Sequence, residues 1–340
     1  PPLVDIVESV TVDEELLDSR TSLATLRLPR SLESLFVAAP LVYYLGATVA
    51  VEPRDSPLLE TDSVEYEFSS SNSFPDEVAS LLCRVFYLDC LVRNAGRFGI
   101  DILELEGIEE LPLDAERLYP LPMSERLADY LALPFVRIED RFPEWPMAIS
   151  VDPTIDNIPA IPHLLDRMSL ILPPVSKPVD ERTMLTRSLG DFYRSTGSSR
   201  SNGQSGTNIL EPATRRGVVH GWMADGTPVD AFKCLPEAFA NRLNYLDQSG
   251  PLSVGVILND QGMSAEFSTV ATTYRSRAET FPIDVDVMTQ LGTDELAGIF
   301  ESSYDFVHYI GHCDPEGLRC QDGNLSISSL SSCKVQAFFL

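Results

Sequence analysis

Two histidines and two cysteines lie close together near the end of the chain, in the stretch YDFVHYIGHCDPEGLRC that covers residues 304–320. Imidazole and thiol groups bind zinc, and they also serve as the general base and the nucleophile of acyl transfer. His308 and His312 are four residues apart, the spacing that puts two imidazoles on one face of a helix. The pattern therefore raises two chemical readings, a metal site and a catalytic site.

The local composition argues against the metal site. The β-branched and aromatic residues around His308 favour a strand, and at about 3.3 Å per residue the two histidines then lie about 13 Å apart. Zinc ligands sit at about 2 Å from the ion, so one ion cannot join both rings. Cys313, Cys320 and Cys333 also lack C-x-x-C spacing. We expect neither a metal nor any other cofactor.

Position favours the catalytic reading for His312. Reactive groups of open α/β sheets collect at the carboxyl ends of the strands, and His312 follows such a strand. Gly311 lets the backbone pass closely, whereas His308 lies inside the strand, where a histidine is by default a core residue. The next apolar run, residues 334–340, would bring its carboxyl-end residue beside His312 if the two strands are neighbours. That residue lies beyond Leu340.

The elements before His312 alternate in type. The apolar run 252–258 indicates a buried strand, residues 266–281 a helix, 283–291 a strand, and 294–303 a helix capped by Thr293. After the His312 strand, a hairpin with Gln321-Asp322-Gly323 at its turn precedes the run that ends at Leu340. This order predicts a doubly wound parallel sheet.

The N-terminal half reads as a separate α+β domain. Residues 39–52 and 64–68 are β-rich, residues 76–93 have helical spacing before Gly96, and 123–133 indicate a helix capped by Ser124 and closed by Pro134. A Ser-, Gly- and Asn-rich stretch follows at 192–208. We therefore divide the chain into an α+β domain (1–190), a flexible linker (191–210) and a C-terminal α/β domain (211–340).

Other polar residues have simpler explanations. His163 stands alone beside prolines and an apolar run, a setting typical of packing. His220 and Trp222 have no obvious partner, and Asn259-Asp260 is an ordinary turn pair after a strand, although a substrate-recognising residue could sit there.

Residues 252–340 resemble the first half of a caspase-like cysteine peptidase of the CHAT group, related to caspases, separase and legumain. The residues that carry the resemblance are FVHYIGH, the hairpin CQDGNL and the strand start KVQAFFL. The resemblance implies a caspase-haemoglobinase-like parallel sheet flanked by helices. It implies a cysteine endopeptidase that acts on a protein or peptide substrate.

The family mechanism carries over in part. His312 matches the histidine that deprotonates the thiol, and the backbone N–H of Cys313 matches an oxyanion donor. Family members often have glycine at that position, and the Cys313 thiol is poorly placed to be the nucleophile. The nucleophile is expected just beyond Leu340, so the chain as printed is expected to be inactive. The alternative is a degenerate, non-catalytic caspase-like module for signalling or assembly.

A nucleotide-binding sheet is disfavoured, because NDQGMSAEF after the first strand of this domain holds a single glycine. The N-terminal domain leaves room for a regulatory protein partner, although no residue identifies one. The chain begins at Pro1-Pro2 and ends on the apolar VQAFFL, so we interpret it as a fragment of a longer protein.

The charge balance sets the remaining expectations. The chain has 51 acidic and 25 basic residues, a net charge of −26, and only Lys177, Lys233 and Lys334 among its bases are lysines. Such a field repels nucleic-acid phosphates and is typical of a haloarchaeal protein, with an acidic mesophilic protein as the alternative. Six scattered cysteines and the absence of about 18 successive apolar residues favour a cytoplasmic protein outside the membrane.

Overall fold

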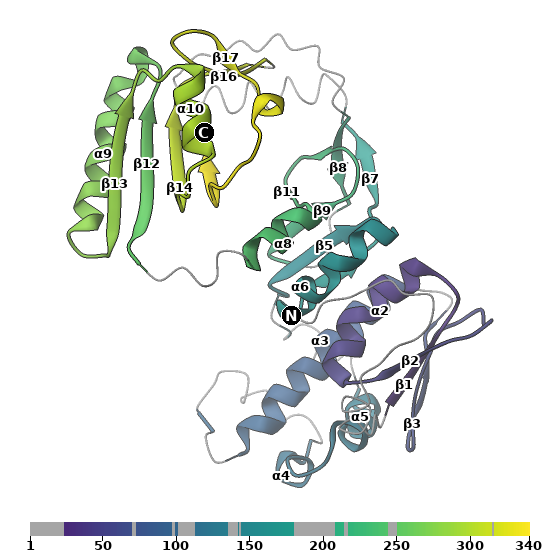
Figure 1. Ribbon diagram of the computed structural model, residues 1–340. Coiled ribbons are helices and arrows are strands. Elements are labelled where there is room, and N and C mark those ends of the chain that lie inside the picture. Colours follow the sequence, from purple (N-terminus) through teal and green to yellow (C-terminus); the bar gives the residue numbers. More distant parts are fainter. Residues whose placement is uncertain are drawn as a thin grey trace. The chain divides into compact units, whose positions relative to one another are not determined.

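The computed structural model describes residues 24–69, 73–96, 99–100, 113–134, 142, 144–179, 208–213, 217–243, 250–314 and 316–340. Within this part the protein is mixed α/β, with several parallel sheets flanked by helices (Figure 1). The chain divides into two compact units, one with the described residues up to Phe239 and one with those from Ala240 onward. No helix in these ranges is both long and apolar enough to cross a membrane.

The first unit begins with a four-stranded sheet in the order β2-β1-β3-β4, covered by long helices. β1 and β2 are parallel, and the other pairs are antiparallel. The elements of this part are β1 (Ala24–Leu28), α2 (Leu32–Leu45), β2 (Thr48–Val51), β3 (Leu58–Thr61), β4 (Glu65–Glu67), α3 (Phe74–Asn94), α4 (Ala115–Leu118) and α5 (Met123–Ala132).

The strand predicted at 39–52 is wrong over most of its length. Helix α2 continues to Leu45, and only β2 is extended. Ser31 caps the helix by accepting a hydrogen bond from the Ser34 N–H, and Gly46 ends it in the left-handed conformation at φ 62°. Burial of the apolar face of α2 overrides the β preference of the Val-Tyr-Tyr run at 42–44.

Helix α3 confirms the prediction for 76–93 and ends at the Ala95 cap, just before Gly96. The cap predicted for α5 is wrong, because Ser124 lies inside the first turn and Pro122 occupies the cap position. The fully buried Asp89 of α3 joins three helices, since it accepts from the Tyr44 hydroxyl at 3.0 Å and from the Tyr130 hydroxyl at 3.2 Å and pairs with Arg126.

A second, fully parallel sheet in the first unit has the order β11-β9-β5-β6, and a small third sheet has the order β10-β8-β7. The elements are β5 (Met147–Val151), η4 (Ile155–Ala160), α6 (Ile161–Asp166), β6 (Leu170–Leu172), β7 (Ser176–Pro178), β8 (Ile209–Pro212), β9 (Val219–Met223), β10 (Thr227–Pro228), β11 (Phe232–Lys233) and α8 (Pro236–Leu243).

These pairings place the unit boundary later than the sequence indicated. β9 pairs with β5, and β8 pairs with β7, so residues 208–239 belong with strands that precede the predicted linker. The start expected for the C-terminal domain, residue 211, therefore lies inside β8. Most of the predicted linker, residues 191–207, lies outside the described residues.

The second unit contains the predicted doubly wound sheet. Its four strands are all parallel, in the order β13-β12-β14-β18, and helices cover both faces (Figure 1). The elements are β12 (Leu252–Leu258), η5 (Gln261–Met263), α9 (Ser264–Ala278), β13 (Ile283–Thr289), α10 (Thr293–Phe300), β14 (Phe306–Ile310) and β18 (Ala337–Phe339).

Strand alternation separates the two cores of this sheet. Val256 and Ile310 pack on the α9 side, whereas Ile257 and Tyr309 pack on the α10 side. The predicted start of α10 is off by one residue, because Gly292 occupies the cap position and Thr293 is the first helical residue.

The predicted hairpin is confirmed, with β16 (Gly317–Arg319) antiparallel to β17 (Asn324–Leu325). A short strand, β15 (Cys313–Asp314), joins it ahead of β16, and η6 (Ile327–Ser329) follows it. Gly317 has φ 133°, and a Cβ there would lie 2.1 Å from the Leu325 carbonyl oxygen. The start of β16, where the chain turns back from β15, therefore requires glycine.

At the amino end of the sheet, Asp305 ties three strands together. Its Oδ2 accepts from the Ser253 N–H at 2.7 Å and from the Ser253 hydroxyl at 2.8 Å, and its Oδ1 accepts from Gln336 Nε2 at 2.6 Å. These bonds join the starts of β12, β14 and β18, far along the strands from His312.

Candidate active site

The carboxyl edge of the second unit's sheet brings two of the loops noted in the sequence side by side. β12 ends at Leu258 and β14 ends at Ile310, and because the strands are parallel and adjacent, their following residues leave the sheet together. The Asn259 N–H donates to the Ile310 carbonyl at 2.9 Å. Asp260 and His312 follow on these two loops.

His312 and Asp260 form a close pair. The Nε2 atom of His312 lies 2.8 Å from Oδ2 of Asp260, and the side chains are 44% and 28% exposed. The other carboxylate oxygen, Oδ1, accepts from the Gly262 N–H at 2.7 Å, which fixes the orientation of the carboxylate. A carboxylate accepts only, so Nε2 carries the proton and the neutral ring keeps Nδ1 as its acceptor.

This geometry equips His312 as a base. No described residue makes a hydrogen bond to Nδ1, and the exposed ring can receive a proton from a group brought to that side. The Asp260 carboxylate would stabilise the imidazolium that results. The pair has the base and the orienting group of a nucleophile–base–orienter arrangement.

The backbone around His312 is held on both sides. The His312 carbonyl accepts from the Arg319 N–H at 2.9 Å, which attaches the loop to β16. At Gly311 an added Cβ would lie 2.7 Å from the Tyr309 ring, so the close passage expected of this glycine is confirmed.

The Asn259 side chain joins three loops at the same edge. Its Oδ1 accepts from the Leu291 N–H at 2.7 Å, and its Nδ2 donates to the Leu291 carbonyl at 3.1 Å and to the Arg319 carbonyl at 3.3 Å. Leu291 follows β13, and Arg319 ends β16. Asn259 is therefore more than a turn residue, because its side chain holds these loops together.

His308 lies apart from this pair, as a core residue. It is 8% exposed inside β14, with Nδ1 3.5 Å from the Tyr274 hydroxyl and its ring centroid 4.9 Å from that of Phe339. Burial lowers the pKa of His308, which favours the neutral ring. Among the described residues no three His, Cys, Asp or Glu side chains are grouped to hold a metal ion.

Cys313 is exposed at the start of β15, and its thiol lies 3.7 Å from the Asp314 carbonyl. The role expected of its backbone N–H stays a prediction. Cys320 is buried against α10, and Cys333 is exposed.

In the first unit the remaining candidates have structural surroundings. His163 is buried and stacks on Phe239 with ring centroids 5.8 Å apart, and Trp222 is buried and donates to the Asp225 carbonyl at 2.9 Å. His220 lines a cavity of about 170 Å³ on the β5–β9 sheet, and Ser150 and Asp230 line it too.

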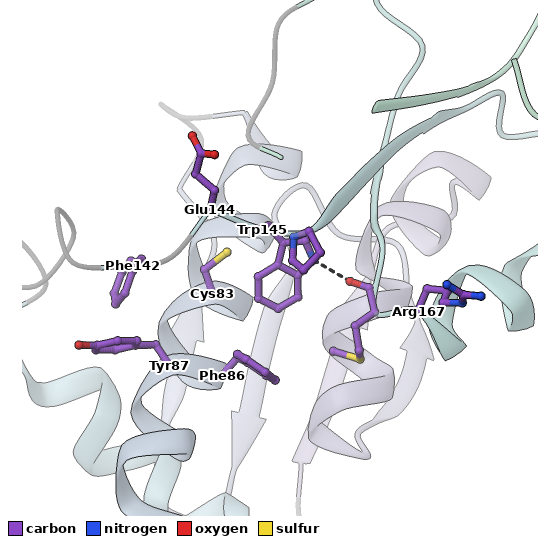
Figure 2. Close-up of a pocket in the computed structure, with 9 residues that line it drawn as sticks. Cys83, Phe86, Tyr87, Phe142, Glu144, Trp145 and Arg167 are labelled. Atoms are coloured by element: carbon purple, nitrogen blue, oxygen red, sulfur yellow. Dashed lines mark hydrogen bonds between the residues drawn. The ribbon is translucent and has the colours of Figure 1, made fainter. Parts of the chain in front are cut away.

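A second cavity in the first unit, of about 210 Å³, is walled by aromatic rings (Figure 2). Trp145 forms one wall and donates its Nε1–H to the Met168 carbonyl at 2.6 Å, and Phe86 packs edge-on against it at 5.3 Å. Cys83 is buried, whereas Glu144 and Arg167 are exposed. The described residues of the lining include no histidine–carboxylate pair like the one at His312, so the carboxyl edge of the second unit is the better candidate site.

Comparison of the chain with protein-family models, curated proteins and solved structures found no match.

Of these two residues, the sequence predicted a catalytic role for His312 and gave no specific indication that Asp260 would pair with it. Asp260 was noted as half of a turn pair, and no signal along the chain reports that the turn after β12 meets the loop after β14. The strand order supplies that information, because the central pair β12 and β14 are sheet neighbours.

Proposed function

We propose that this chain contains the first half of a caspase-like cysteine peptidase domain of the CHAT group, with His312 as its general base. The observation that supports the proposal best is the Asp260–His312 pair at the carboxyl edge of a parallel β13-β12-β14-β18 sheet. The succession of β14, the Gly311-His312 loop, the hairpin and β18 also supports it, because these are the segments on which the resemblance rests.

The pairing of β14 with β18 suggests where a nucleophile would stand. Phe306 pairs with Ala337 and His308 with Phe339, a constant offset of 31 residues. If β18 continues in this register, the same offset carries His312 to position 343. A cysteine at or next to that position would present its thiol to Nδ1 of His312.

The chemistry then balances without a cofactor. Nδ1 takes the thiol proton, the thiolate attacks the peptide carbonyl carbon, and the oxyanion binds the Cys313 N–H. The imidazolium, held by Asp260, returns the proton to the leaving amine, and the C–N bond breaks. Water then hydrolyses the thioester with His312 as base again.

The test is covalent labelling of the parent protein by a thiol-directed peptide electrophile in high salt. We expect labelling that His312→Ala abolishes, because the thiolate then forms too rarely. The matched control is His308→Gln, which changes the imidazole inside β14 and leaves the Asp260–His312 pair in place. Labelling that survives His312→Ala unchanged contradicts the proposal.

A non-catalytic module is the second candidate function. It is favoured by Cys313, whose side chain stands where a glycine would leave the oxyanion position more open. No labelling in any variant would support this module.

A further inference from the structure

The Asn259 cluster consists of the Asn259 side chain, the backbone N–H and carbonyl of Leu291, and the Arg319 carbonyl. The side chain makes three hydrogen bonds to backbone groups of Leu291 and Arg319, at 2.7 to 3.3 Å. The Asn259 cluster thereby joins the loops that follow β12 and β13 to the hairpin that follows β14. These are the three segments that build the carboxyl edge around His312.

The Asn259 cluster is linked to the backbone of both Asp260 and His312. Asn259 precedes Asp260 in the chain, so a shift of the Asn259 backbone moves the carboxylate. On the other side, Arg319 donates its N–H to the His312 carbonyl at 2.9 Å, while its own carbonyl accepts from Asn259. One side chain therefore sets the positions of both partners, which meet at 2.8 Å.

The Arg319 carbonyl of the Asn259 cluster accepts a second hydrogen bond. The hydroxyl of Tyr309, a residue only 1% exposed, also donates to the Arg319 carbonyl. This carbonyl thus receives two donors, one from the loop after β12 and one from inside β14. Hydrogen bonds weaken steeply when donors and acceptors lose alignment, so release of this point would loosen the Asp260–His312 contact.

We propose that Asn259 is a positioning residue that holds Asp260 and His312 in register through Leu291 and Arg319. The geometric part of this inference stands on the hydrogen bonds alone, and its kinetic consequence rests on the proposed function. Asn259 takes no part in proton transfer.

The Asp305 cluster at the opposite edge of the sheet provides a matched control. It also joins three segments of the second unit through a polar side chain, but it contacts neither His312 nor Asp260. Asp305→Asn should lower thermal stability without altering the pair. A general loss of stability is thereby separated from a loss of positioning.

The geometric test is the proton NMR spectrum of ¹⁵N-histidine-labelled protein at low temperature. We expect the wild type to show a hydrogen-bonded Nε2–H signal of His312, assigned by its absence in His312→Gln and lost in Asp260→Ala. Asn259→Ala should lose this signal or weaken it severalfold, and Asp305→Asn should keep it. An Asn259→Ala protein that melts earlier yet keeps the signal at full intensity overturns the proposal.

The kinetic test uses the peptide electrophile on the parent protein. Asn259→Ala should slow inactivation at saturating probe on the order of 10- to 100-fold with unchanged probe affinity, since a misplacement of about 1 Å costs about that much. Absence of labelling in the wild type defeats the proposed function only, because the NMR signal still decides the role of Asn259.

Asn259→Asp covers the case in which Asn259→Ala does not fold. It keeps Oδ1 as the acceptor for the Leu291 N–H and removes the Nδ2 donor to the Arg319 carbonyl. A weakened Nε2–H signal in Asn259→Asp supports the proposal, and a signal at full intensity contradicts it.

Discussion

The Asp260 carboxylate determines which nitrogen of His312 remains to accept a proton. Nε2 is engaged at 2.8 Å, and the second carboxylate oxygen is held by the Gly262 N–H. The neutral ring is therefore held in the tautomer whose Nδ1 is the acceptor. A histidine alone on an exposed loop would have neither a fixed tautomer nor a fixed direction.

Replacing Asp260 with Ala should slow electrophile labelling about 10- to 100-fold at unchanged probe affinity, because the base is no longer held near the thiol. The control is Asp314→Ala, which removes an exposed carboxylate two residues from His312 and leaves Asp260 in place. Inactivation rates over a range of probe concentrations measure both effects. Equal rates for the two variants would mean that Asp260 has no orienting role.

Tyr309 gives the second unit a pH dependence in the alkaline range. Burial raises the pKa of Tyr309 to about 12, above the value of about 10 for an unfolded chain. Its stabilising contribution is therefore complete below about pH 10 and is lost as the pH rises toward 12. Melting temperatures of wild type and Tyr309→Phe between about pH 9 and 12 should converge as the pH rises, and parallel curves would contradict this assignment.

At the element scale, strands and helices of the second unit follow the sequence pattern closely. The apolar run of β12 and the Asp-Gly turn of the hairpin are local signals, and both are found where they were predicted. Helix α2 shows the limit of such signals. Its Val-Tyr-Tyr segment favours a strand locally, but the helix buries Phe36, Val37 and Leu41 in the core.

Replacing each of two helix glycines with alanine should change the stability in opposite directions. Gly46 ends α2 at φ 62°, and a Cβ there would meet nothing within 4 Å, so the cost of Gly46→Ala is conformational, about 1 kcal/mol of lost stability. Gly298 lies exposed inside α10, again with open space, so Gly298→Ala should gain about 0.5–1 kcal/mol. Denaturant unfolding of each variant checks both, and two changes of the same sign would contradict the account.

At the scale of the whole molecule, composition located the boundary between the units poorly. The Ser- and Gly-rich stretch at 192–208 looked like a border, yet β8 and β9 pair with strands that precede it. Pairing between distant segments depends on strand edges and burial, which a composition shift does not report. The position of His312 was better predicted, because the end of a strand is a local feature.

The net charge of −26 makes stability depend on salt. In molar salt the Debye length falls to about 3 Å, so repulsion among the carboxylates is screened. The melting temperature should rise continuously from about 0.1 M to about 2 M KCl. A melting temperature that is flat or falls over this range would contradict the halophilic interpretation and favour an acidic mesophilic protein.

The proposed mechanism requires that His312 deprotonates a thiol at the end of β18. The most direct measurement is to label the parent protein with a cysteine-directed peptide electrophile and identify the modified residue by mass spectrometry. We predict a single modified cysteine at or next to position 343, the position that the β14–β18 offset of 31 residues places beside His312. Modification of Cys313 instead, or labelling that is the same in His312→Ala, would contradict it.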